Sequence, residues 1–171
     1  MKKILLLILM VSFATGVHAQ QAGFGVKAGY ANITAKAKYQ GVTASASESG
    51  FYVGILKEIP LGDSFILQPE LLYANAAETG FLYLPIMAKY NVSPQFSLQA
   101  GPQANFVLDS APEENKFGLD IAFGAGFNID SHFFIDARYG LEVTNRMGEE
   151  YDGYDIKGSY NTLMVGVGYK F

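Results

Sequence analysis

Asp130, Ser131 and His132 are the residues whose types first suggest chemistry, because a hydroxyl, an imidazole and a carboxylate can together form a hydrolase site. Outside the first twenty residues, His132 is the one histidine of the chain. Consecutive side chains point in different directions, however, so these three residues do not form a triad on their own. Asp and Ser are also common in tight turns. We therefore predict a turn at 130–132 and no catalysis.

A second candidate is the carboxylate pair Asp136 and Glu142, which could carry out acid–base catalysis. Arg138 lies at the same parity, so in a strand it shares a face with both carboxylates. Buried opposite charges normally pair with one another. Structural ion pairing is therefore the expected role, and the chain is not predicted to be an enzyme.

Two acidic segments could bind a cation. Their carboxylates are Asp109, Glu113 and Glu114 in one segment and Glu149, Glu150, Asp152 and Asp155 in the other. Oxygen ligands suit Ca²⁺ or Mg²⁺, but the spacing does not match an EF-hand, and solvated loops have the same composition. The sequence leaves this choice open, and we predict no resident metal or cofactor.

The glycine-rich stretches "GAGF" (124–127) and "GVG" (166–168) are weak signals for phosphate binding. A phosphate loop needs a helix after it, and neither stretch precedes a helical pattern. Small residues on a crowded face are the better interpretation.

The chain begins with two lysines, an apolar run and "VHA" before Gln20. This pattern predicts a cleaved secretory leader at 1–19 and a mature domain at 20–171. Loss of Lys2 and Lys3 takes the formal charge from −4 to −6, which disfavours nucleic acid as a partner. There is no cysteine, so disulfides and thiolate metal sites are excluded.

The mature sequence contains eight segments in which apolar residues alternate with polar or small ones. Each is about 10–14 residues long, which suits a tilted membrane strand better than a globular one. The segments are 23–32, 50–59, 65–74, 81–92, 96–108, 116–129, 133–144 and 159–171.

The connections between these segments predict how the strands are joined. Tight turns at 60–64, 93–95 and 130–132 mostly alternate with longer polar loops, expected at 33–49, 75–80, 109–115 and 145–158. The prediction is an all-β fold, an eight-stranded antiparallel up-and-down transmembrane β-barrel in the outer membrane.

The two faces of the segments differ in a way that favours lipid outside. One face is aliphatic, with Phe or Tyr near both ends, as expected for membrane-interface girdles. The other face is rich in glycine and carries isolated charges of both signs, and eight strands leave a lumen that side chains can fill. We predict a filled polar lumen containing Lys27, Glu58, Glu70, Lys89, Asp120, Asp136, Arg138, Glu142 and Lys170.

Three prolines conflict with this interpretation. Pro69, Pro85 and Pro102 each fall inside a predicted strand. Proline cannot donate a ladder hydrogen bond and is normally confined to edges or bulges. A closed barrel has no edge, so we expect bulges or missing bonds at these positions.

Five motifs of the mature chain are distinctive: "LQPELLYA" (67–74), "YLPIMAKY" (83–90), "LQAGPQANFVL" (98–108), "FIDARYGLEVTN" (134–145) and "VGVGYKF" (165–171). Together they resemble the PorT-like outer-membrane β-barrel family of Bacteroidetes-type bacteria. The resemblance covers essentially the whole mature chain and implies an eight-stranded barrel. That family often has Glu where this chain has Tyr83. The namesake's role in secretion is not general to the family.

The expected function is an integral outer-membrane protein that acts through its surface loops. Its expected partners are outer-membrane lipid, the outer-membrane insertion machinery and an extracellular protein. An accessory role in a secretion system is the main alternative. A soluble periplasmic barrel that binds a small apolar ligand is a further alternative, and a pore ranks below these because the lumen is narrow.

The chain ends on a strongly alternating segment that must pair with the first segment to close the barrel. Tyr169 and Phe171 are its last two outward-facing residues. A terminal aromatic residue on such a strand resembles the signal that the insertion machinery reads. We therefore predict that Tyr169 and Phe171 form an insertion signal.

Overall fold

The structure is a computed structural model that describes residues 23–39, 41–108, 116–146 and 156–171. The predicted leader and the acidic residues from Asp109 to Glu114 and from Glu149 to Asp155 lie outside these ranges, so the structure does not test them. Among the described residues, no helix is long and apolar enough to cross a membrane.

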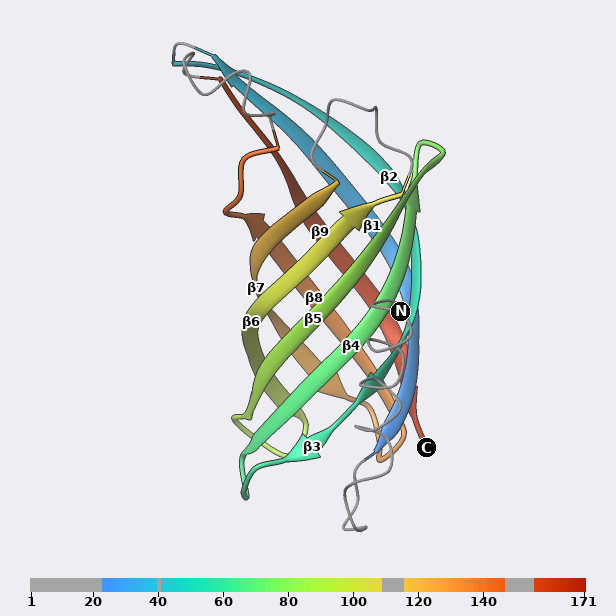
Figure 1. Cartoon of the computed structure of the whole chain (residues 1–171). Coiled ribbons are helices and arrows are strands. Elements are labelled where there is room, and N and C mark those ends of the chain that lie inside the picture. Colours follow the sequence, from blue (N-terminus) through green and yellow to red (C-terminus); the bar gives the residue numbers. More distant parts are fainter. Residues whose placement is uncertain (1–22, 40, 109–115, 147–155) are drawn as a thin grey trace, which may run out of the picture.

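The strands form one closed antiparallel sheet (Figure 1). Its elements are β1 (Phe24–Tyr39), β2 (Val42–Lys57), β3 (Ile59–Pro60), β4 (Phe65–Ala76), β5 (Thr79–Asn91), β6 (Phe96–Val107), β7 (Phe117–Asn128), β8 (Phe133–Glu142) and β9 (Ile156–Lys170). Neighbours in sequence pair with one another, β9 pairs with β1, and β2 pairs with β4. This is the predicted up-and-down barrel.

The two-residue β3 continues β2 and does not add a ninth strand to the barrel wall. Leu56 pairs with Glu70 on β4, and Ile59 pairs with Leu67 in the same register. The break between β2 and β3 therefore lies opposite Pro69 and Gln68. Because Pro69 has no N–H, the hydrogen-bond ladder is interrupted there. Counted with β2 and β3 as one strand, the barrel has eight strands.

The other two prolines also interrupt the ladder without shifting it. The β4–β5 pairing stops at Pro69↔Ile86 and resumes at Leu72↔Tyr83, so the gap lies beside Pro85. The β5–β6 pairing has a similar gap beside Pro102, with the register unchanged across it. The expected missing pairs are confirmed, and none of these gaps is a bulge that shifts the register.

The period of two divides the side chains between lumen and exterior. Along β8, for example, Phe134, Asp136 and Arg138 are buried, whereas Phe133 and Ile135 are exposed. Exposed apolar side chains cover the outside of every full-length strand. They include Val26, Tyr30, Phe51, Ile55, Phe65, Tyr73, Ile86, Phe96, Leu98, Phe123, Phe133, Ile135, Val165 and Val167. An apolar exterior around a polar interior is the arrangement that lipid requires.

The predicted loop at 33–49 was wrong. β1 runs to Tyr39 and β2 begins at Val42, and this hairpin stays paired along its whole length. β9 follows β1 up to Ile156, so three strands extend past the other strands at the long-loop end (Figure 1). The segment was assigned to a loop because its Ala, Ser, Thr and Lys residues lack the apolar contrast of a membrane strand. Its extended conformation comes from its strand partners.

The predicted loop at 75–80 was also wrong. β4 and β5 extend to Ala76 and from Thr79, which leaves a two-residue turn. Ala77 and Glu78 both have positive φ, at 47° and 67°. Two positive φ values are typical of the type I′ turn, whose twist matches a hairpin.

The C-terminal strand closes the barrel beside β1. The backbone N–H of Phe171 donates to the carbonyl of Phe24 at 2.8 Å. The Tyr169 ring meets Phe171 edge-on at 5.4 Å and Phe133 at 5.0 Å. The chain thus ends in an exposed aromatic cluster at the short-turn end, where Figure 1 places the C-terminus.

We predict that deleting Phe171 lowers the amount of protein in the outer membrane more than it lowers barrel stability. The deletion removes one hydrogen bond, whose net contribution is about 1 kcal/mol, and the ring contact with Tyr169, but it also removes the predicted insertion signal. Quantitative blotting of outer-membrane fractions would measure the first effect, and urea unfolding of refolded protein the second. Phe96→Ala is a matched control within the same girdle. Normal membrane levels of the truncated protein would refute the insertion signal.

Candidate functional site

The centre of the lumen contains two cations and two carboxylates from three strands. The Arg138 guanidinium donates to both carboxylate oxygens of Glu70, at 2.9 and 2.7 Å. Lys27 Nζ lies 2.6 Å from Asp136 Oδ2 and 3.4 Å from Glu70 Oε2. These side chains are at most 5% exposed, so all four charges are removed from water. We call this set the central network.

Amide and phenol groups supply further hydrogen bonds to the central network, although Arg138 Nε has no hydrogen-bond partner among the described residues. Gln68 Nε2 donates to Glu70 at 2.6 Å, and Arg138 donates to Gln99 Oε1 at 2.9 Å. The Tyr52 hydroxyl donates to Asp136 at 3.4 Å. Buried charges are stable only when such partners are present. This arrangement points to a structural core, in which the carboxylates are neutralised and not poised for catalysis.

A second ionic layer lies nearer the short-turn end. Lys89 Nζ is 2.6 Å from Glu58, and Lys170 Nζ is 3.6 Å from the other oxygen of the same carboxylate. Lys170 also donates to Asn128 at 3.1 Å. Both ammonium groups also lie near the Phe134 ring, at 5.9 and 5.7 Å from its centroid. The layer thus joins three charged side chains at this end of the lumen.

The third layer lies toward the long-loop end. Asp120 accepts hydrogen bonds from Gln103 and Asn105, each at 2.7 Å. Glu142 accepts one from Arg146 Nε at 2.7 Å, and Arg146 also donates to Asn105. The structure thus places all nine predicted lumen residues inside the barrel, but in three separate layers.

Sequence reasoning missed Arg146, which it had assigned to a loop. The side chain is 3% exposed and continues the lumen-facing alternation of Glu142 and Thr144. That parity was a signal that could have identified it. The nine predicted residues comprise four cations and five anions. With Arg146 added, the set has five positive and five negative side chains.

The lumen is not uniformly polar, which corrects the prediction. Buried apolar side chains from β1, β2, β4, β5, β6 and β9 form a cluster in its long-loop half. They are Ala31, Ile33, Tyr52, Leu72, Ala74, Ala76, Phe81, Tyr83, Val107 and Met164. This part of the barrel therefore has an ordinary hydrophobic core.

Glycines provide the space for the largest lumen side chains. A Cβ on Gly166 would collide with the Tyr52 ring, and one on Gly168 would collide with the Phe134 ring. The "GVG" stretch lies inside β9 and not at the start of a helix. Its glycines are thus explained by packing.

The 130–132 segment is a turn. Asp130 accepts backbone hydrogen bonds from Phe133 and His132, both at 2.7 Å, and these bonds lower the pKa of its carboxyl group. The His132 ring stacks on Tyr169 at 5.5 Å, and the Ser131 hydroxyl lies 2.9 Å from Nδ1. The acid thus binds backbone and not imidazole, and all three residues are exposed.

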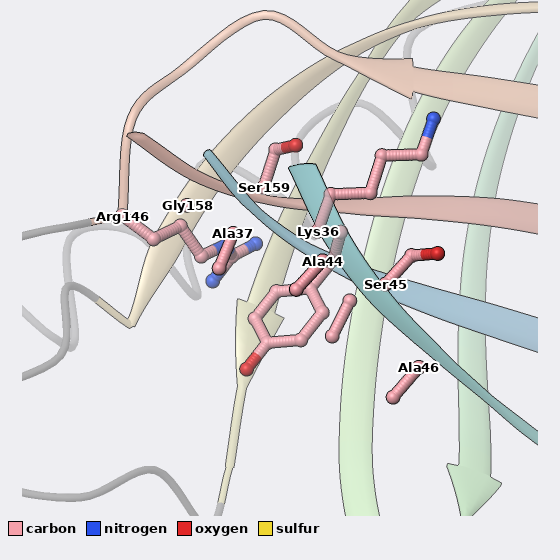
Figure 2. Close-up of a pocket in the computed structure, with 10 residues that line it drawn as sticks. Lys36, Ala37, Ala44, Ser45, Ala46, Arg146, Gly158 and Ser159 are labelled. Carbon is pink, nitrogen blue, oxygen red and sulfur yellow. The ribbon is translucent and has the colours of Figure 1, made fainter. Parts of the chain in front are cut away.

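A cavity of about 320 Å³ lies at the long-loop end (Figure 2). Small side chains of the extended hairpin, such as Ala37 and Ala44, line it together with Arg146 and Tyr160. The Arg146 guanidinium lies 4.8 Å from the Tyr160 ring centroid. Among the described residues, no group of three or more His, Asp or Glu could hold a metal ion.

The family profile for the outer membrane protein β-barrel domain matches residues 4–171. The chain belongs to this outer-membrane β-barrel family. A comparison with curated proteins gave no match. The apolar exterior of this outer-membrane barrel agrees with the family, so the alternative of a soluble periplasmic barrel is set aside.

Solved structures share the fold of this outer-membrane barrel at low sequence identity. Ail, the attachment invasion locus protein of Yersinia pestis, solved in complex with the heparin analogue sucrose octasulfate, is 20% identical, with a TM-score of 0.50. The match covers 88% of this chain and 100% of Ail. Neisserial surface protein A is 17% identical, with a TM-score of 0.54, and the match covers 86% of this chain and 97% of that one.

A de novo designed transmembrane β-barrel is 12% identical to this chain, with a TM-score of 0.53. The match covers 91% of this chain and 100% of the design. These likenesses show the fold alone, since identity is low in every case.

We predict that Arg138→Met destabilises the barrel by about 3–5 kcal/mol, because it leaves the buried Glu70 without its bidentate partner. The double variant Glu70→Leu/Arg138→Met should recover most of this loss, because Lys27 and Asp136 still pair. Urea unfolding of the refolded variants would measure both. Lys36→Met, on the extended hairpin, is the control for a partly exposed cation. Equal stability of Arg138→Met and wild type would contradict a structural role for the central network.

Proposed function

We propose that the protein is a closed, non-catalytic barrel that anchors an interaction surface in the outer membrane. The carrying observation is the extended sheet of β1, β2 and β9, which projects past the other strands at the long-loop end. Loops at this end of outer-membrane barrels are extracellular. A paired hairpin of this length presents an ordered surface, which lowers the conformational entropy lost when a protein partner binds.

The filled lumen supports an anchor over a pore. The three ionic layers and the apolar cluster occupy the interior from the short-turn end to the long-loop end. Charges that satisfy one another bind no substrate, which supports a role without catalysis. We also propose export by the leader at 1–19 and insertion through Tyr169 and Phe171.

The PorT-like assignment is a finer proposal within the outer-membrane family. It rests on the motifs around Pro69, Pro85 and Pro102, which coincide with the ladder gaps of the barrel. An accessory role in secretion remains its functional alternative. Co-purification with secretion components would favour that role over an independent surface protein.

We predict that the protein gives no steady single-channel current in planar bilayers, because side chains fill the lumen. Glu70→Gly/Arg138→Gly removes the largest ionic pair and serves as a positive control that should produce measurable current. Steady channels from the wild-type protein would contradict the closed lumen.

We predict that shortening the hairpin abolishes surface attachment without preventing membrane insertion. Replacing residues 34–47 by Asn-Gly joins Ile33 to Glu48 through a two-residue turn. These two residues pair across β1 and β2 in the same hydrogen-bonding pattern as Tyr39 and Val42, which flank the present turn. Attachment of producing cells to protein-coated surfaces would be compared with cells that lack the protein. Outer-membrane fractionation controls for insertion. Unchanged attachment of cells producing the shortened barrel would contradict the proposal.

A further inference from the structure

The extended part of β2 has a strand on one side only. β2 pairs with β1 from Lys57 to Val42, but its pairing with β4 ends at Gly50↔Ala76. Residues 42–49 therefore have no strand partner on the β4 side among the residues that the structure describes. Figure 1 shows this part of the hairpin standing clear of β4 and β5.

The backbone groups of this edge can be assigned by parity. The N–H of Glu58 donates to the carbonyl of Gly23, next to the start of β1, at 2.8 Å. The β1–β2 register is constant from there to the turn, so even-numbered residues of β2 direct their backbone groups toward β1. Thr43, Ser45 and Ser47 therefore direct both N–H and C=O toward the open side.

This edge lacks the features that normally prevent strand addition. Natural edges are protected by proline, lysine, bulges or a covering element. Residues 42–49 read "VTASASES", with neither proline nor lysine, and the β1–β2 register has no bulge. All eight residues are exposed. An extended polypeptide could therefore pair with them along the backbone.

Charges on the neighbouring strand indicate the chemistry of the added segment. Lys36 and Lys38 of β1 lie directly opposite Ser45 and Thr43, on the outward face. A strand added beside β2 would be separated from these lysines only by the short side chains of Ser45 and Thr43. A lysine side chain is long enough to extend over them to the added strand.

The only described carboxylate on this part of the hairpin is on the other face. Glu48 lies opposite Ile33, which points inward and is 4% exposed. An acidic segment would therefore meet two cations on the outward face, and a basic segment would be repelled.

We propose that the open edge of β2 binds an extended, acidic segment of another extracellular protein by strand addition. Backbone pairing with Thr43, Ser45 and Ser47 supplies the affinity, and Lys36 and Lys38 select for acidic side chains. This inference rests on the proposed interaction role of the long-loop end and names its partner class.

The test uses the full barrel in nanodiscs and a fluorescent synthetic peptide in which Glu alternates with Thr. Anisotropy should show saturable binding that weakens with salt, as charge screening requires. A peptide with Lys in place of Glu should bind at least about tenfold more weakly, since it reverses every charge contact. Hydrogen exchange should show that the acidic peptide protects the amides of Thr43, Ser45 and Ser47.

Two variant sets separate the backbone and charge contributions. Ser47→Pro removes an edge N–H that β1 does not use and should weaken binding about tenfold, whereas Ser47→Ala should leave it unchanged. Lys36→Glu/Lys38→Glu needs no backbone change and should reverse the preference between the two peptides. This charge reversal keeps the test valid if the proline variant alters the hairpin.

Each alternative outcome would overturn the proposal. Binding to vesicles containing phosphate-bearing lipid, without amide protection by peptide, would assign the lysines to lipid. Protection that rises with protein concentration alone would assign the edge to a second copy of the chain. Hairpin-dependent cell attachment without peptide binding would leave the proposed function standing and refute this inference alone.

Discussion

The requirement that every backbone polar group in lipid be paired within the protein determines this structure. An open sheet would leave two edges exposed to hydrocarbon, so β9 pairs with β1 and β2 pairs with β4. Closing eight strands gives a lumen that is only wide enough for side chains. Any charge that points inward is then removed from water, and it must find an opposite charge. The pairs Arg138–Glu70 and Lys27–Asp136 follow from this constraint.

The prolines show how much interruption a closed ring tolerates. Gaps beside Pro85 and Pro102 leave the register of the flanking pairs unchanged. The lumen shows a related complementarity, in which a glycine on one strand admits a large side chain from another. Gly166 with Tyr52 is the clearest case, because a methyl group there would collide with the hydroxyl end of the Tyr52 side chain. A narrow lumen therefore selects small and large residues together.

The parity of the sequence was sufficient to predict the strands, their faces and the nine inward charges. It was not sufficient to pair those charges, because Glu70 and Arg138 lie on strands distant in sequence and meet only across the lumen. The stagger between strands decides that pairing, and no local pattern encodes it. Arg146 was missed because the predicted strand ended at Thr144, although the same alternation reaches it. The hairpin at 33–49 was missed because its composition carries no membrane signal.

The point where the outward face changes composition marks the upper limit of the lipid-facing region. Along β1 the outward residues run from Phe24 through Tyr30 to Lys36 and Lys38, while the pairing with β2 and β9 continues unbroken. The constraint from lipid thus ends near Tyr30, but the strands do not. Beyond that level, pairing is no longer imposed by hydrocarbon, since water can satisfy backbone groups. The extended edge therefore needs a reason other than lipid, and the proposed strand addition would supply one.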